Sequence, residues 1–427
     1  MTTRSARKMA CDALVRIEDG AYSHVVLPTM LRGSSLSPRD RAFVTDLVYG
    51  TVRWQRRLDA LLAPHGRRSI RRLDPPVRAA LRIGAHQLVH GVPAHAAVSA
   101  TVDAAPSRAR GYVNAVLRAL STTGPPWPEP ASEAVALSYP DWIVDLLGED
   151  LGMADARAAL AASNEARAVS LRPNPLRTTP KELLDDVARG AAQAAPGGLV
   201  PEALTVRGAG DLGVLPAVSE GRATPQDQAS QAVIRYLAPI PGDRVLDVAA
   251  APGGKTTGAA ELVGPAGRVV ALDVDAGRLR LVRQSADRLR LTNVSLVRAD
   301  SRRLPVASKT FDRVLVDAPC SGLGALRRRP DLRWQLDAEA IEPLADLQVL
   351  LVLEAARAVR SGGQLAYSVC TMTRRETIDV GERVIDQLSG FTPLPPPEGW
   401  RPWGRGGLVL PQDHGTDGMF VLGLQRA

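Results

Sequence analysis

Cysteine is scarce in this chain, and no apolar stretch is long enough to cross a bilayer. The 427 residues include three cysteines, an odd and small number that argues against a disulfide framework. The longest uncharged stretch, residues 83–102, is interrupted by histidines, a glutamine and a proline, which excludes a membrane-spanning helix. Residues 1–8 lead into an amphipathic pattern, so we expect no signal peptide. We therefore expect a protein of the reducing cytoplasm with no membrane partner.

Lysine is also scarce, although the chain is basic. It stands only at positions 8, 181, 255 and 309, whereas the net charge is +8 and the pI about 9.8. Most of the positive charge is therefore arginine, which clusters in two places: Arg53, Arg56, Arg57, Arg67, Arg68, Arg71, Arg72, Arg78 and Arg82, and then Arg327, Arg328 and Arg329. Such clustering favours binding to a phosphate backbone, and a merely solvated face is the alternative.

Length and composition, 45% hydrophobic and 23% charged, predict two or three globular domains. Apolar residues recur at helical spacing over residues 6–120, and prolines at 124–130 mark a linker. Helical patterns resume over 132–164, before a mixed α/β segment over 168–218. The predicted domains are 1–130 (all-helical), 131–222 (helical and small α/β, connecting) and 223–427.

The last domain alternates strands and helices, a pattern typical of a parallel, doubly wound α/β sheet. The predicted strands are 244–248, 268–272, 294–299, 312–316 and 364–368. Ligands bind such sheets beyond the carboxyl ends of the strands. Residues that follow the strands are therefore the candidates for a site.

A loop of small residues follows the first of these strands: Ala249, Ala250, Ala251, Pro252, Gly253, Gly254 and Lys255. Small residues let the backbone turn tightly and approach a ligand, while the following helix offers N–H groups. A nucleotide-phosphate P-loop also ends in Gly-Lys-Thr, but it needs glycine at position 249, and Pro252 lacks a backbone donor. A nucleotide triphosphatase is the weaker interpretation for that reason.

Acidic residues follow three later strands: Asp273, Asp300 and Asp317. Each alone is an ordinary helix cap, but three in register favour a ligand with a ribose and an adenine. Asp273 would accept hydrogen bonds from ribose hydroxyls and Asp300 from the adenine amino group. We predict S-adenosylmethionine as the cofactor.

Two of the cysteines, Cys320 and Cys370, stand just past predicted strands. We expect them to share one crevice and to carry nucleophile chemistry, and two buried small hydrophobes are the alternative. His86 and His90 lie one helical turn apart, as in zinc proteases, but Gln87 takes the place of the catalytic glutamate. We expect no metal.

These residues resemble the RNA cytosine-5 methyltransferase family. The resemblance lies in residues 247–257, Asp317-Ala318-Pro319-Cys320-Ser321-Gly322, Tyr367-Ser368-Val369-Cys370, residues 328–334 and Gln226-Asp227-Gln228-Ala229-Ser230. Residues 41–53, 93–98 and 113–118 resemble a NusB-like helical RNA-binding domain. The combination is similar to the bacterial RsmB/Sun subgroup, which often has cysteine where this chain has Ala249, a position that the family does not use for catalysis.

The resemblance implies a NusB-like N-terminal domain, a small α/β connecting domain and a C-terminal Rossmann-like methyltransferase domain that uses S-adenosylmethionine. It implies methylation of carbon 5 of a cytosine in small-subunit (16S) ribosomal RNA. Cys370 would add to carbon 6 and Cys320 would assist release, with the reverse assignment as the alternative. Asp317 would bond the cytosine edge, and Lys255 would line the pocket.

Two other functions remain open at this point: methylation of a transfer-RNA cytosine, and a non-catalytic RNA-binding or ribosome-assembly role. Intact Cys320, Cys370, Asp317 and Lys255 argue against the second. No obligate protein partner is evident from the sequence.

Overall fold

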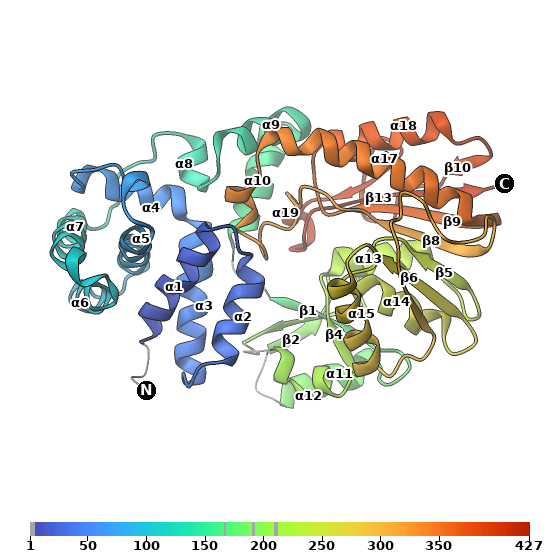
Figure 1. Ribbon diagram of the computed structural model, residues 1–427, viewed down its shortest axis with the longest axis horizontal. Helices are drawn as coiled ribbons and strands as arrows, with labels where there is room; N and C mark the ends of the chain where they lie inside the picture. Colours follow the sequence, from blue (N-terminus) through green and yellow to red (C-terminus); the bar gives the residue numbers. More distant parts are fainter. Residues whose placement is uncertain (1–4, 166–167, 190–192, 209–211) are drawn as a thin grey trace. The chain divides into compact units, whose positions relative to one another are not determined.

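The computed structural model describes residues 5–165, 168–189, 193–208 and 212–427 (Figure 1). Outside the described residues lie 1–4, 166–167, 190–192 and 209–211. The first of these ranges begins the segment where we expect no signal peptide. The chain forms two compact units, Met1–Glu149 with Leu326–Leu336, and Asp150–Ala325 with Asp337–Ala427. In the described ranges, no helix is both long and apolar enough to cross a membrane.

The first unit is helical, as the apolar spacing predicts. Its helices are α1 (Ala6–Glu18), α2 (Ser23–Arg32), α3 (Pro38–Arg53), α4 (Gln55–Leu62), α5 (Pro75–Val89), α6 (Ala94–Ala104), α7 (Arg110–Thr123), α8 (Glu133–Leu137) and α16 (Leu332–Gln335). Apolar side chains of α1, α3, α5 and α7 share one buried core. Helix α5 is its centre, because every residue from Val77 to Leu88 is buried.

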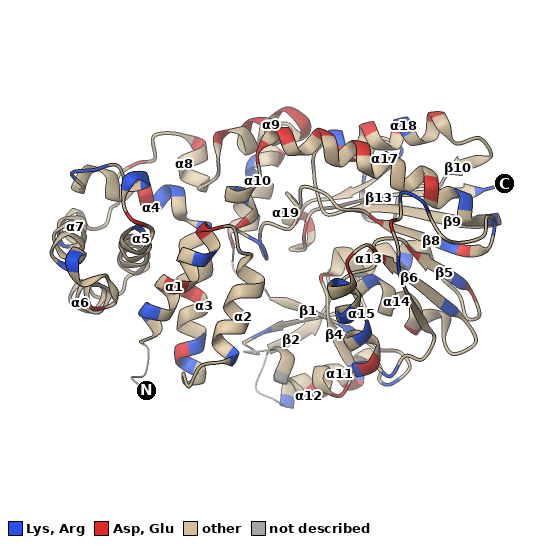
Figure 2. Ribbon diagram, viewed as in Figure 1, with Lys and Arg blue, Asp and Glu red and all other residues tan. Residues whose placement is uncertain are grey.

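The burial of α5 corrects part of the predicted basic cluster. Arg78 and Arg82 are buried and form ion pairs with Glu18 and Asp59, at N–O distances of 2.5 and 2.8 Å. A buried charge is tolerated when it is paired, so these two arginines are part of the packed interior and are not available to a phosphate backbone. The arginines that remain exposed in this stretch lie between α4 and α5: Arg67, Arg68, Arg71 and Arg72 (Figure 2).

The second predicted basic segment belongs to the helical unit as well, although it follows the Cys320 motif in sequence. The backbone N–H of Ser23 donates to Asp331 Oδ2 (3.3 Å), and the indole N–H of Trp334 donates to the carbonyl oxygen of Val52 (2.7 Å). The buried guanidinium of Arg333 lies 3.8 Å from the centre of the Tyr139 ring. The motif at residues 328–334 therefore packs the segment Leu326–Leu336 into the helical unit.

The second unit contains a small antiparallel sheet in the strand order β2-β3-β1-β4. Its strands are β1 (Val169–Pro173), β2 (Gln193–Pro196), β3 (Leu204–Arg207) and β4 (Ala223–Pro225). Helices α11 (Pro180–Arg189) and α12 (Pro216–Ser219) belong to the same part, and α10 (Met153–Asn164) precedes them in the chain. Helix α9 (Asp141–Leu151) lies mostly in the first unit. Apolar side chains of the four strands, α11 and α12 form a separate small core.

The large sheet has the order β11-β12-β13-β9-β8-β5-β6-β7, with β10 paired to β13. Its strands are β5 (Arg244–Asp247), β6 (Arg268–Asp273), β7 (Val294–Arg298), β8 (Phe311–Asp317), β9 (Val359–Val369), β10 (Phe391–Pro393), β11 (Arg401–Trp403), β12 (Gly406–Val409) and β13 (Met419–Arg426). The five predicted strands are confirmed as β5 to β9 and are mutually parallel. The antiparallel strands β10 to β13 are an addition that the sequence pattern does not predict.

Helices cover both faces of the large sheet (Figure 1). Helices α13 (Gln228–Leu237), α14 (Gly254–Val263) and α15 (Ala276–Arg288) pack on one side, and α17 (Ile341–Ala358) and α18 (Val380–Gln387) on the other, while α19 (Pro411–His414) precedes β13. The central strands are buried on both faces, as expected of a doubly wound sheet.

Three loops meet at Gly324, beyond the carboxyl ends of β8 and β9. The N–H of Gly324 donates to the carbonyl oxygen of Cys370, and the N–H of Gly418 donates to the carbonyl oxygen of Gly324, both at 2.9 Å. A Cβ at position 324 would lie 2.0 Å from the carbonyl oxygen of Gly418 and 3.0 Å from that of Cys370. Backbone atoms cannot move aside as a side chain can, so only glycine fits this crossing.

We expect Gly324→Ala to lower the free energy of unfolding by about 1–3 kcal/mol, the usual cost of overpacking. Gly111→Ala in α7 is the matched control, because its added Cβ meets no atom within 4 Å. That variant should be neutral or slightly more stable, since alanine favours a helix. Calorimetric unfolding of both variants measures the difference, and equal stabilities would contradict the close backbone crossing.

Candidate active site

The two thiols that follow β8 and β9 lie side by side. These strands are parallel neighbours in which Asp317 pairs with Ser368, so Cys320 and Cys370 leave the sheet at the same edge. Their Sγ atoms are 3.4 Å apart, and both side chains are partly exposed. The structure therefore brings the two predicted cysteines into contact, and their shared catalytic crevice stays a prediction.

The pKa values of the two thiols shift in opposite directions. A hydrogen bond from Cys320 lowers the pKa of Cys370, whereas the same contact, together with burial, raises the pKa of Cys320 well above its ordinary value. A thiolate is a far better nucleophile than a thiol. The directions of these two pKa shifts favour Cys370 as the thiolate, while the 3.4 Å contact itself allows either sulfur to be the donor.

Asp317 and Lys255 form an ion pair at the same edge. Lys255 lies in the first turn of α14, and its Nζ is 2.7 Å from Asp317 Oδ2. The hydroxyl of Ser368 donates to Asp317 Oδ1 at 2.9 Å. Asp317 is thereby fixed from both sides, while a third of its side chain remains exposed.

The loop between β5 and α14 places small residues against the sheet edge. Gly253 has φ +107° at the N-terminus of α14, and an added Cβ there would lie 3.1 Å from Val282 Cα. Asp247, which ends β5, is buried, and burial raises its pKa to about 7. Thr256 donates to Asp247 Oδ2 (2.7 Å), while Oδ1 has no hydrogen-bond partner within the described part of the chain. Such an unpaired buried oxygen next to a glycine loop fits a site that receives a polar ligand.

The other two predicted acids end the neighbouring strands. Asp273 is nearly buried, and its Oδ1 accepts from the N–H of Asp275 at 3.0 Å. Asp300 follows β7 and is exposed, where Arg302 pairs with it and lowers its pKa to about 2. Both acids lie at the carboxyl edge of the sheet, beyond two adjacent strands.

A buried carboxylate, Glu376, joins the two cysteine loops, and our sequence analysis missed it. The N–H and the hydroxyl of Ser321 donate to its Oε1 and Oε2 at 2.8 and 2.5 Å, and the hydroxyl of Thr373 donates to Oε2 at 3.0 Å. Gln348 donates both to Glu376 Oε1 (3.1 Å) and to the carbonyl oxygen of Pro319 (2.9 Å). Residues next to Cys320 and residues next to Cys370 therefore share one acceptor.

Glu376 is fully buried in a single π-helical turn, Arg375–Asp379. In the sequence it follows two arginines in a polar string, which is typical of a solvated helix start. The only local signal would have been its position six residues after Cys370. Short π-helical turns are often found at functional sites.

The chain has the fold of a methyltransferase that uses S-adenosylmethionine. In this fold a doubly wound sheet has its ligand loop after the first parallel strand and acids after the next two strands. More narrowly, the chain belongs to the RsmB/F family of 16S rRNA methyltransferases, whose family model matches residues 234–425. The NusB family matches residues 4–122, and the ferredoxin-like domain of RsmF/B-like methyltransferases matches residues 139–213. The predicted family, three-part fold and cofactor are confirmed, and the small connecting domain is identified as ferredoxin-like.

Relatives match over their full length. Probable ribosomal RNA small subunit methyltransferase B of Synechocystis sp. is 36% identical, covering 99% of this chain and 100% of that protein. The protein of the same name from Bacillus subtilis is 32% identical over 100% of both. The crystal structure of PH0851 has a TM-score of 0.86 at 25% identity, covering 100% of this chain and 99% of that chain. The crystal structure of NSun6 from Pyrococcus horikoshii with SFG shares the fold, with a TM-score of 0.62 at 23% identity. The match covers 67% of this chain and 98% of that chain.

We expect Cys370 to react with iodoacetamide at lower pH than Cys320 or Cys11, because its thiolate is stabilised by the neighbouring S–H. Cys320→Ala removes that donor, so the pKa of Cys370 rises and its alkylation midpoint moves to higher pH. Peptide mass spectrometry over a range of about pH 6–10 gives the midpoint of each thiol. Cys11 is a thiol of the helical core, and burial raises its pKa to about 12. The variant Cys11→Ala, which removes this thiol, is the control. A lower midpoint for Cys320 than for Cys370 would reverse the assignment.

We expect Glu376→Ala to destabilise the protein by about 3 kcal/mol or more, since several buried donors lose their acceptor at a cost of about 1–3 kcal/mol each. Glu382→Ala on the exposed face of α18 is the matched control and should change the free energy of unfolding by less than about 0.5 kcal/mol. Urea unfolding measures both variants. A loss for Glu376→Ala no larger than that of the control would show that the carboxylate does not hold the loops.

Proposed function

We propose that the protein transfers the methyl group of S-adenosylmethionine to carbon 5 of a cytosine in small-subunit ribosomal RNA, through a covalent bond between Cys370 and carbon 6. The observation that carries the proposal is the 3.4 Å contact of two thiols with opposite pKa shifts. Methylation of small-subunit ribosomal RNA is the activity of the family, and the cytosine chemistry is our inference from the thiols.

Carbon 5 of cytosine is a poor nucleophile, which explains the need for a thiolate. Addition of the Cys370 sulfur to carbon 6 gives an enamine whose carbon 5 is electron-rich, and this splits one difficult step into easier ones. The bound cofactor supplies an electrophilic methyl group. The carbon 5 proton and the enzyme sulfur must then leave together to restore the aromatic ring.

Cys320 is suited to the second half of this reaction. Before addition, the nearby Cys370 thiolate keeps Cys320 protonated. Once Cys370 is bonded to carbon 6, its sulfur no longer carries a negative charge, so the pKa of Cys320 falls. Cys320 is then able to act as the base that removes the carbon 5 proton, and elimination of Cys370 follows.

The ion pair of Asp317 and Lys255 supports the same geometry. An acceptor that faces the cytosine edge stabilises the protonated N3 that forms as sulfur adds to carbon 6. Lys255 and Ser368 hold Asp317 in a fixed orientation, which means that little reorganisation is needed during the reaction. The hydrogen bond from Cys320 is the main cause that lowers the pKa of Cys370; of the ion pair, Asp317 raises that pKa and Lys255 lowers it to a smaller extent.

The acids at the strand ends would hold the cofactor. Asp273 would accept from the ribose hydroxyls, Asp300 from the adenine amino group, and the loop at residues 249–254 would approach the methionine part. The unpaired oxygen of buried Asp247 supports a polar ligand at this place. The exposed arginines between α4 and α5 would contact the phosphate backbone of the RNA.

We expect a denaturation-resistant protein–RNA adduct to accumulate with Cys320→Ala and not with Cys370→Ala, because the first variant adds to carbon 6 but cannot resolve the adduct. Each variant and the wild type are incubated with S-adenosylmethionine and unmodified small-subunit ribosomal RNA, then separated on a denaturing gel. Transfer RNA in a parallel reaction is the substrate control. An adduct only with Cys370→Ala would reverse the two roles, an adduct only with transfer RNA would change the substrate, and methylated RNA without any adduct would exclude the covalent route.

A further inference from the structure

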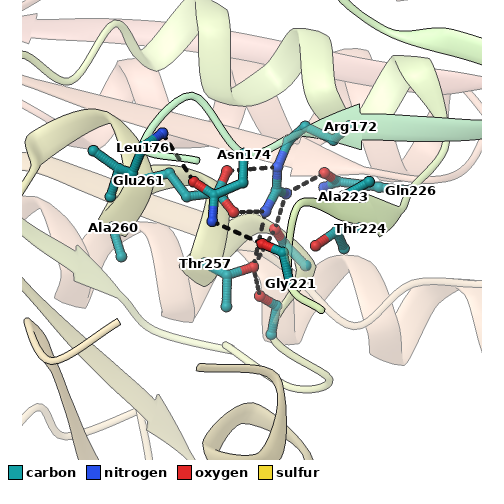
Figure 3. Close-up of polar contacts among 12 residues, drawn as sticks. Arg172, Asn174, Leu176, Gly221, Ala223, Thr224, Gln226, Thr257, Ala260 and Glu261 are labelled. Atoms are coloured by element: carbon teal, nitrogen blue, oxygen red, sulfur yellow. Dashed lines mark hydrogen bonds and ion pairs between the residues drawn. The ribbon is translucent and has the colours of Figure 1, made fainter. Parts of the chain in front are cut away.

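Arg172, on β1 of the small sheet, reaches the first turns of α14 (Figure 3). Its Nη1 donates to the carbonyl oxygen of Gly254 at 2.6 Å, and its Nη2 donates to the hydroxyl of Thr257 at 3.0 Å. That hydroxyl donates in turn to the carbonyl oxygen of Gly253 at 2.8 Å. One side chain of the small domain therefore holds the segment in which the predicted cofactor loop becomes a helix.

The remaining donors of Arg172 are also used. Its Nε and Nη2 donate to the two carboxylate oxygens of Glu261, at 3.0 and 2.9 Å, and Nη1 donates to Gln226. A guanidinium has five N–H donors in one plane, and here all of them have acceptors. The side chains of Arg172 and Glu261 are 11% and 2% exposed, so this bidentate pair is shielded from water.

Two features indicate that the arrangement is specific to this place. A cation is unfavourable near the N-terminus of a helix, and here the buried Glu261 neutralises it. Gly258 leaves the space that the guanidinium occupies, since a Cβ at that position would lie 2.9 Å from Arg172 Nη1. Gln226, from a motif to which the proposed function gives no role, supplies one of the acceptors.

We propose that Arg172 is a positioning residue for S-adenosylmethionine, through which the small ferredoxin-like domain fixes the cofactor loop. This inference rests on the proposed use of residues 249–255 as the cofactor site. The small domain is then part of the cofactor site and not only a connection between two others.

A second arginine of the same unit provides a matched control. Arg288 on α15 also joins the two domains, donating to the carbonyl oxygens of Val218 (2.6 Å) and Ala223 (2.9 Å) and to the hydroxyl of Thr224 (3.1 Å). All three partners lie in the small domain or in its last strand, and none lies in the cofactor loop. Loss of Arg288 therefore loosens the same domain pair without releasing Gly254 or Thr257.

The test compares the affinity of the full chain for S-adenosylmethionine, by isothermal titration calorimetry, among wild type, Arg172→Met, Arg172→Lys and Arg288→Met. We expect the Kd to rise about tenfold or more for Arg172→Met and less for Arg172→Lys, because the loop loses its fixed position. Arg288→Met should stay within about twofold of wild type. In methyl-transfer assays, Arg172→Met should raise the KM for the cofactor and leave the KM for RNA unchanged.

An unchanged Kd for Arg172→Met, or equal losses for Arg172→Met and Arg288→Met, would overturn the inference. If Arg172→Met does not fold, Gly258→Ala gives the same test, because its Cβ displaces Nη1 while the arginine remains; an unchanged Kd in that variant would also count against it. Failure of the wild type to bind S-adenosylmethionine would contradict the proposed function itself. That result is distinct from normal wild-type binding with no effect of Arg172.

Discussion

The active-site geometry depends on one buried carboxylate. Glu376 accepts hydrogen bonds from the loop of Cys320 and from the loop of Cys370, so the distance between the two sulfur atoms is set by groups that are themselves fully buried. A satisfied polar network in a low-dielectric interior is rigid, because every lost bond leaves a costly unpaired group. The proposed chemistry needs such rigidity, since two thiols shift each other's pKa in opposite directions only while they remain in contact.

The cofactor side of the site follows the same physical rule. Arg172 and Glu261 form a buried, fully hydrogen-bonded ion pair, and it holds the turn that leads into α14. Lys255, in that same turn, reaches Asp317 at the end of β8. Two ion pairs therefore connect α14 to its neighbours. Arg172–Glu261 joins it to the small sheet, and Lys255–Asp317 joins it to the strand that precedes Cys320.

Much of this organisation is predictable from local patterns. The strands β5 to β9 follow from short apolar runs separated by helical periodicity, and the neighbouring cysteines follow from the rule that parallel strands end at one edge. The antiparallel strands β10, β11 and β12 were missed because they are only 3, 3 and 4 residues long, too short for a periodic signal. Strand β13 was missed although it is an apolar run like those of β5 to β9. Arg78 and Arg82 were misinterpreted as surface charge, because a sequence does not reveal that Glu18 and Asp59 lie opposite them.

The sequence by itself determined the family, the cofactor class and the pair of thiols, since these depend on residue types at fixed spacing around strand ends. The roles of Cys320 and Cys370, the boundaries of the domains and methylation at carbon 5 of an rRNA cytosine stay predictions. Only the tertiary structure decided that the two sulfur atoms are in contact, that Glu376 joins the cysteine loops, and that Arg172 reaches the predicted cofactor loop. These features arise from contacts between segments far apart in the chain, and the burial that makes a charged group rigid is a property of the packed interior.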